Sequence, residues 1–242
     1  MRYDKYAMPV DPRVLKKDFE TDSSVNLNSL LRRIGKLLPL KDANPLYLKM
    51  VNEAFYTLWA QIDNKVGINL SDRENLVPHF TLMGKLVRPK ALKFAYRGVR
   101  LSSYEPKLLS QTYPAIKKSG GVITNPQEIE VLSHLEGLAY GLRSWTDSKG
   151  AAANWALGNK GNHVDPKKDK VVFICPNPNV LFDVTKYWDA LDKYHEEETE
   201  RWDIYGRFPF DYNEKIIYLQ NPKIQQISFD KNIGIWYVTV SE

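Results

Sequence analysis

The chain has 242 residues, of which 43% are apolar and 26% charged. This composition is typical of a globular protein with an ordinary hydrophobic core and excludes a fully disordered chain. Lys and Arg total 34 against 29 for Asp and Glu, and the resulting net charge of +5 permits an anionic ligand but is too small to indicate a dedicated nucleic-acid binder.

The number of cysteines and the length of the apolar runs exclude further classes of protein. One cysteine, Cys175, rules out an intrachain disulfide and a Cys-rich zinc site, and four histidines leave little room for a metal cluster, so we expect no metal. No apolar run reaches the length of a membrane span, and the N-terminus lacks the apolar core of a signal peptide. We therefore expect a cytoplasmic protein without a membrane partner, unless a route that needs no signal peptide secretes it.

The first third of the chain has the pattern of α-helices. Apolar residues recur every three to four positions in two segments. Pro39 ends the first segment, and Asn44-Pro45 has the form of a cap followed by proline at the first helical position. The two apolar faces are Leu27, Leu30, Leu31, Ile34, Leu37 and Leu38, and then Leu48, Val51, Phe55, Leu58 and Ile62.

Strands alternate with short helices after residue 85. A third helix is predicted to begin at Asn125-Pro126, with Glu128 at the capping-box position and an apolar face of Ile129, Leu132, Leu135, Leu138 and Leu142. Shorter helices are predicted over residues 151–157 and 185–201. Strands are predicted over residues 93–101, 142–146, 171–174, 216–219 and 233–240.

This order of elements indicates an α+β protein. We expect an N-terminal helical region over residues 1–80 and a core over residues 81–242. No linker rich in Gly, Ser or Pro separates them, so we expect one compact unit.

The first candidate motif is Tyr96-Arg97-Gly98, inside an otherwise apolar strand. A buried arginine needs a partner, and a glycine beside it lets a ligand or another backbone approach closely. Residues 85–100 hold six basic residues and no acidic one, which favours an anionic ligand such as a pyrophosphate. The same pattern also fits an edge strand with solvated charges.

The second motif is Ser144-Trp145-Thr146, directly before the Ala-rich segment 151–156, which includes Trp155. Alternate residues of a strand share a face, so the two hydroxyls should lie on one side and Trp145 on the other. The alternative is an ordinary polar strand end.

The third motif is an aromatic turn that contains Tyr212 and leads into an apolar strand at Glu214. The alternative is that Glu214 is an ordinary surface glutamate.

Taken together, the three motifs resemble the Arg-Ser-Glu class of mono-ADP-ribosyltransferases, which includes arginine-modifying bacterial toxins and enzymes that T-even phages use on host proteins. The resemblance covers residues 93–240 and follows the family's order of elements. It implies a split β-sandwich of two roughly perpendicular sheets around an NAD cleft, with NAD as substrate and no metal.

The resemblance also implies roles for individual residues. Glu214 would stabilise the oxocarbenium-like ribose, and Ser144 and Thr146 would orient that carboxylate, so that Glu214 lies within hydrogen-bond reach of one of them. Arg97 would hold the phosphates or a ribose near them, and Gly98 would offer backbone contacts to the nicotinamide amide. The predicted catalytic set is Glu214, Arg97, Ser144 and Thr146, and the predicted NAD-binding set is Tyr96, Arg97, Gly98, Ser144, Trp145, Trp155 and Tyr212.

The chain departs from the family at one position. Arginine-modifying members carry Glu-x-Glu, whereas this chain has Tyr212-Asn213-Glu214. A rival Glu198-Thr199-Glu200 lies in an acidic run that reads as a solvated helix face, too far before Ile216 to fit the motif.

The expected function is transfer of ADP-ribose from NAD to a protein acceptor, with arginine one candidate, by a phage or bacterial effector acting in a host cytoplasm. The alternatives are an NAD glycohydrolase, an RNA-directed ADP-ribosyltransferase or phosphotransferase of the same fold, and a non-enzymatic module that binds a host protein or nucleic acid.

Overall fold

The computed structural model describes residues 74–85, 87, 89–100, 109, 113–124, 132–158, 169–192 and 213–242. The helices predicted within residues 27–62 and the capping box at Asn125 lie outside these ranges. The chain divides into two compact units, Met1–Pro89 with Leu181–Phe210 and Lys90–Val180 with Asp211–Glu242. The boundary predicted after residue 80 stays a prediction, because most of residues 1–80 are not described.

The first unit contains a small group of packed aromatic residues. Its described elements are the 3-10 helix η3 (Glu74–Leu76), α4 (Val77–Met83), most of β5 (Val180–Asp183) and α8 (Val184–Asp192). The ring of Phe182 lies 6.1 Å from that of Phe80 and 5.4 Å from that of Tyr187, between ring centroids. The Asp183 carboxylate accepts the backbone N–H of Lys186 and so caps α8.

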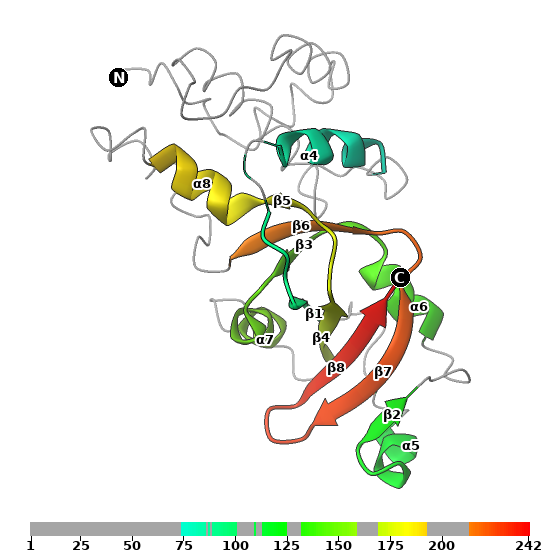
Figure 1. The fold of residues 1–242 in the computed structure, drawn as a ribbon. Helices are drawn as coiled ribbons and strands as arrows, with labels where there is room; N and C mark the ends of the chain where they lie inside the picture. Colours follow the sequence, from blue (N-terminus) through cyan, green and yellow to red (C-terminus); the bar gives the residue numbers. More distant parts are fainter. Residues whose placement is uncertain are drawn as a thin grey trace, which may run out of the picture. The chain divides into compact units, whose positions relative to one another are not determined.

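The second unit is built on a mixed sheet (Figure 1). Its strands are hydrogen-bonded in the order β2-β7-β8-β4-β1-β3-β6, antiparallel except for the parallel pair β4 and β8. The strand bounds are Phe94–Arg100 (β1), Val122–Thr124 (β2), Gly141–Thr146 (β3), Lys170–Pro176 (β4), Glu214–Leu219 (β6), Lys223–Asp230 (β7) and Ile235–Ser241 (β8). Its described helices are α5 (Tyr113–Lys118), α6 (Leu132–Ala139) and α7 (Lys149–Leu157).

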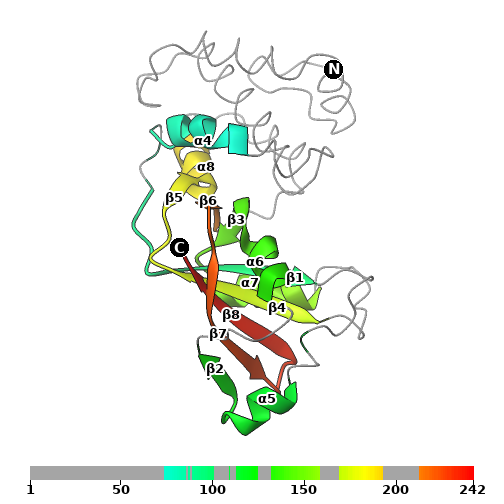
Figure 2. The same ribbon diagram turned by 90° about the vertical axis from the view of Figure 1, so that its right-hand side faces the viewer.

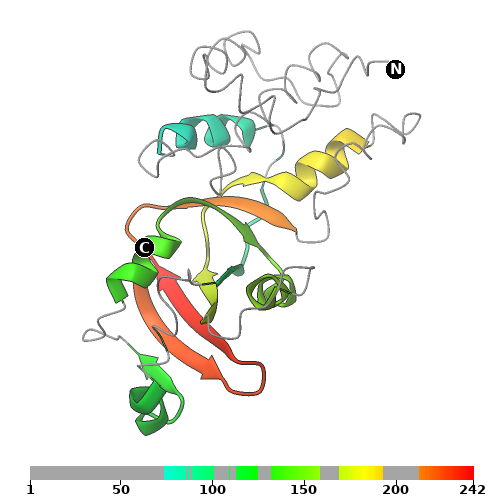
Figure 3. The same ribbon diagram turned by 180° about the vertical axis from the view of Figure 1, so that it is seen from behind.

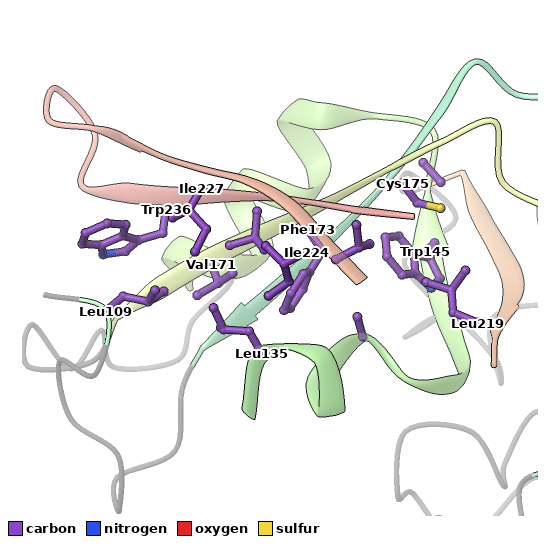
Figure 4. Packing of buried hydrophobic residues seen from close by; sticks show 14 of the residues in the cluster. Leu109, Leu135, Trp145, Val171, Phe173, Cys175, Leu219, Ile224, Ile227 and Trp236 are labelled. Carbon is purple, nitrogen blue, oxygen red and sulfur yellow. The ribbon is translucent and has the colours of Figure 1, made fainter. Parts of the chain in front are cut away.

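The two faces of this sheet are covered by different helices. Val171 and Phe173 of β4 share a core with Leu135 of α6, whereas Val172 packs with Ala152 and Ala156 of α7. Figure 4 shows Leu135 beneath the strands that carry Phe173 and Ile224, and Figure 3 shows α7 beside β1. Burial on both faces explains why β4 reads as a continuous apolar run in the sequence.

Strands β1 and β3 share fewer paired residues than the other neighbouring strands of this sheet. One pair of opposing residues, Tyr96 and Thr146, joins these strands, whereas Phe94–Arg100 of β1 is paired with β4 along its whole length. Because hydrogen-bonded neighbours continue from β2 to β6, the expected pair of separate perpendicular sheets is not confirmed. The mixed α and β composition is confirmed.

Most predicted elements of the second unit are present, with corrections at their ends. The strands predicted at 93–101, 142–146, 171–174 and 216–219 correspond to β1, β3, β4 and β6, and the helix predicted at 151–157 corresponds to α7. Leu142 belongs to β3 rather than to the preceding helix, because Gly141 turns the chain with a φ of 83°. The strand predicted at 233–240 corresponds to β8, but Ile233 lies in the turn before it, where Gly234 has a φ of 67°.

The last predicted helix is described only in part, and the strand β7 was not predicted. In the first unit, the helix predicted at 185–201 corresponds to α8 as far as Asp192, and residues 193–201 lie outside the described part. The strand β7, which pairs with β2 and β8, was missed (Figure 2). Its alternation of apolar residues is broken by a register shift between Ile224 and Gln226, which hides the period of two.

Candidate functional site

Three neighbouring strands bring the predicted catalytic residues together. Thr146 on β3 lies opposite Tyr96 on β1 and, across its other edge, opposite Glu214 on β6. Opposing residues of adjacent strands point to the same face of a sheet. Tyr96, Thr146 and Glu214 therefore form one row across β1, β3 and β6.

The Glu214 carboxylate accepts a hydrogen bond from one of the two hydroxyl residues predicted to orient it. Ser144 Oγ donates a hydrogen bond of 2.5 Å to Glu214 Oε1, and both residues are half-buried. Ser144 lies opposite Ile216, so Glu214 is its diagonal neighbour on the same face. The contact expected between Glu214 and the Ser-x-Thr motif is confirmed, and it fixes one oxygen of the carboxylate.

Arg97 reaches the same serine from β1. Its Nη1 donates a hydrogen bond of 2.7 Å to the main-chain oxygen of Ser144. This bond lies next to the pair Tyr96 and Thr146, which is the one pair of opposing residues between the described strands β1 and β3. The guanidinium thus spans the two strands as they diverge and lies close to Ser144.

The Thr146 side chain stabilises the turn that leads into α7. Its side chain is 7% exposed, and its Oγ1 accepts the backbone N–H of Ser148 at 3.0 Å. Ser148 Oγ in turn accepts the N–H of Ala151 and caps α7. Thr146 Oγ1 thus fixes the main chain at the start of this helix, and its predicted role in orienting the Glu214 carboxylate stays a prediction.

Gly98 is a point of close backbone approach, as its position beside Arg97 suggested, and the approaching group is a helix. A Cβ built on Gly98 would lie 2.0 Å from the main-chain oxygen of Ala152 in α7. Real side chains do not tolerate that distance to a backbone atom. The side of Gly98 on which a side chain would lie is therefore filled by α7, and the role of Gly98 in NAD binding stays a prediction.

The predicted aromatic residues are not gathered at one place. Trp145 is 2% exposed and belongs to the core on the α6 side, so the structure does not bring it together with Glu214. Tyr96 packs against the α7 side of the sheet. Trp155 on α7 is 54% exposed. Tyr212 and the rival Glu198 and Glu200 lie outside the described residues.

An ion pair beside the site was not predicted. Lys215, the residue after Glu214, is 4% exposed, and its Nζ lies 3.8 Å from Asp147 Oδ2 at the end of β3. This pair ties β6 to the turn that follows Thr146. A lysine between Glu214 and the apolar Ile216 was the available signal, since a charge in a buried strand needs a partner.

Other chemistry is not indicated by the described residues. Burial, with a smaller contribution from Glu242, raises the pKa of the Cys175 thiol to about 11, so this core residue is a poor nucleophile at neutral pH. Within the ranges that the structure describes, no group of three or more His, Cys, Asp or Glu could hold a metal ion. The same ranges contain no helix that is both long and apolar enough to cross a membrane.

Comparison with known proteins gives weak structural neighbours. No family model and no curated protein matches the sequence. The chain is similar to Vis toxin, an ADP-ribosyltransferase from Vibrio splendidus, with 13% identity and a TM-score of 0.33, covering 98% of this chain and 75% of that chain.

Two further structures of Vis ADP-ribosyltransferase are also similar. The complex with agmatine has 11% identity and a TM-score of 0.30, covering 98% of this chain and 76% of that chain. The complex with the M6 inhibitor has 14% identity and a TM-score of 0.34, covering 100% of this chain and 90% of that chain.

Proposed function

We propose that this protein is a mono-ADP-ribosyltransferase that cleaves NAD and transfers ADP-ribose to a macromolecular acceptor. One observation carries the proposal: Arg97, Ser144 and Glu214 form a continuous chain of contacts across β1, β3 and β6. A cation and a carboxylate are held on two sides of one serine. That arrangement suits a substrate with an anionic pyrophosphate and a sugar that becomes positively charged.

The carboxylate supplies the chemical step. The bond between nicotinamide and ribose C1 breaks, nicotinamide keeps the electron pair and leaves neutral, and positive charge develops on the ribose, as in glycoside cleavage. A carboxylate held in place before the reaction stabilises that charge without reorganisation. Glu214, fixed by Ser144 Oγ, is the residue for this task. The acceptor nucleophile then bonds to C1 and its proton is released.

The arginine supplies binding. Its bond to the Ser144 carbonyl holds Arg97 as a cation in a defined position. Arginine presents a planar fork of donors that matches phosphate geometry. We infer that Arg97 meets the pyrophosphate of NAD while Glu214 faces the nicotinamide ribose, with Ser144 setting the spacing between them.

The acceptor is proposed more broadly. The position two residues before Glu214 is Tyr212 rather than the glutamate of arginine-modifying enzymes. A carboxylate that could activate a guanidinium is therefore missing from that position. We propose a protein of a bacterial host as the acceptor, as for a phage or bacterial effector in the host cytoplasm, without restricting the modified residue to arginine.

NAD carrying two different labels tests this function. The full chain is incubated with bacterial lysate and NAD labelled in the nicotinamide ring or in the adenylate. We expect free labelled nicotinamide together with adenylate label on a macromolecule that protease treatment degrades.

The other outcomes separate the alternatives. Label on a nuclease-sensitive species would identify a nucleic-acid acceptor. Release of nicotinamide without transfer would identify a glycohydrolase, which the missing first glutamate favours. No consumption of NAD in any lysate would refute the proposal and leave a binding module.

A further inference from the structure

The residue directly before Glu214 has a left-handed backbone. Asn213 has a φ of 49° and is exposed. Among the described non-glycine residues one other, Asn177, has a positive φ, of 47°. Positive φ is uncommon outside glycine, and asparagine tolerates it better than most residues because its short polar side chain can hydrogen-bond locally.

The left-handed conformation of Asn213 is notable for where it lies in the chain. A strained backbone is retained where the surrounding structure requires it, often at a functional site. Asn213 is the last residue before β6, and Glu214 is the first residue of that strand. The φ of Asn213 therefore decides the direction in which the chain enters β6 at Glu214.

The chain after Glu214 is already fixed. Lys215 is buried and paired with Asp147, and the residues that follow are paired with β3 as far as Leu219. Glu214 itself lies opposite Thr146. With the strand held on this side, the left-handed backbone of Asn213 sets the direction from which the preceding chain meets Glu214.

We propose that Asn213 is a positioning residue, whose left-handed backbone places the Glu214 carboxylate against Ser144 Oγ. The effect on turnover rests on the proposed function, and the effect on the contact between Glu214 and Ser144 does not. Asn213 acts through its backbone, so the proposal assigns no contact with substrate to its side chain.

Matched substitutions at the two left-handed asparagines test the proposal. Asn213→Gly keeps the conformation, whereas valine, a β-branched residue, strongly disfavours it. Asn177→Gly and Asn177→Val make the same changes at an exposed turn where the backbone N–H bonds to Lys93 O. If Asn213→Val is not recovered folded, Asn213→Ala provides a milder loss of the conformation.

Nicotinamide release gives the first measurement. We expect Asn213→Val to lower kcat about 10- to 100-fold, as for a misplaced catalytic group, with KM for NAD nearly unchanged. Asn213→Gly should restore kcat, and both Asn177 variants should leave it unchanged. Loss of kcat in Asn213→Gly as large as in Asn213→Val would overturn the proposal, because it would assign the effect to the side chain. Unchanged kcat in Asn213→Val would overturn it as well.

A double-mutant cycle gives a measurement that does not depend on NAD. If Asn213→Val displaces Glu214, the bond to Ser144 is already lost, and Ser144→Ala should then shift the urea unfolding midpoint less than it does in the wild-type chain. Ser144→Ala and Asn177→Val should be additive. Additivity in both pairs would overturn the proposal, whereas coupling in a chain that never cleaves NAD would retain the positioning role and reject the proposed function.

Discussion

Ser144 joins the two charged residues of the site through two different atoms. Its hydroxyl donates to Glu214, and its main-chain oxygen accepts from Arg97. A substitution of Ser144 can remove the first contact but not the second, because the carbonyl belongs to every residue. Arg97 should therefore keep its position in Ser144→Ala, while Glu214 loses a restraint.

Arg97 offers a direct test of phosphate binding. Arg97→Ala should weaken NAD binding about tenfold or more, because a hydrogen-bonded charge contact is lost. Arg97→Lys should recover little of that affinity, since lysine lacks the planar fork and cannot reproduce the bond geometry to Ser144. Isothermal titration with NAD measures both. Equal dissociation constants in the three proteins would remove Arg97 from the binding site.

For individual residues of the site, the sequence predicted some features and not others. The pairing of Glu214 with Ser144 followed from the resemblance of the motifs to a known class. The alternation of β3 predicted that Trp145 lies on the face away from Ser144, and the structure buries that face in the core that includes Leu135. The left-handed backbone of Asn213 could not be predicted, because asparagine is found in many other conformations.

The packing of α7 on β1 organises the elements around the site. Gly98 allows the helix backbone to approach the strand next to Arg97, and the N-cap of α7 follows Thr146 by two residues. The αL residue Gly158 ends the helix with a φ of 78°. The helix therefore ties the end of β3 to the middle of β1.

Gly98→Ala should destabilise this packing. The new Cβ would meet the Ala152 carbonyl, a backbone atom that can move away only if α7 shifts, so we expect a loss of about 1–3 kcal/mol in the free energy of unfolding. Gly150→Ala is the matched control, because its Cβ would find no atom nearer than Ser148 Oγ at 3.9 Å. The control should raise stability by up to about 1 kcal/mol through helix propensity.

Urea denaturation of the two variants measures the difference. A stable Gly98→Ala protein with wild-type activity would show that α7 does not depend on the close approach at Gly98. Equal losses in both variants would point to a general intolerance of α7 to change rather than to the predicted clash.

Element types were more predictable from the sequence than element pairing. Strand-like runs indicated β1, β3, β4, β6 and β8, and the Ala-rich segment indicated α7. They carried no information on which strands are neighbours, because the strand order of the second unit joins segments far apart in the chain. The bulge in β7 and the short β2 are irregular or brief, and local periodicity is a weak signal for both.

For the whole molecule, the site depends on contacts between distant segments. Ser144 lies 47 residues from Arg97 and 70 residues from Glu214 in the sequence. The second unit is assembled from residues 90–180 and 211–242, with residues 181–210 assigned to the first unit. The candidate site therefore forms only when β6, after this interruption, pairs with β3.

In the proposed mechanism, cleavage of NAD depends on the Glu214 carboxylate. Glu214→Gln keeps the size of the side chain and removes its charge, so we expect nicotinamide release at saturating NAD to fall about 10²- to 10³-fold, with NAD affinity changed much less.

The measurement compares Glu214→Gln with Glu198→Gln and Glu200→Gln, which carry the same change in the rival acidic motif. We expect both controls to release nicotinamide at close to the wild-type rate, and Glu214→Gln to release it far more slowly. Full activity in Glu214→Gln, together with loss in either control, would contradict it and move the catalytic role to the acidic segment.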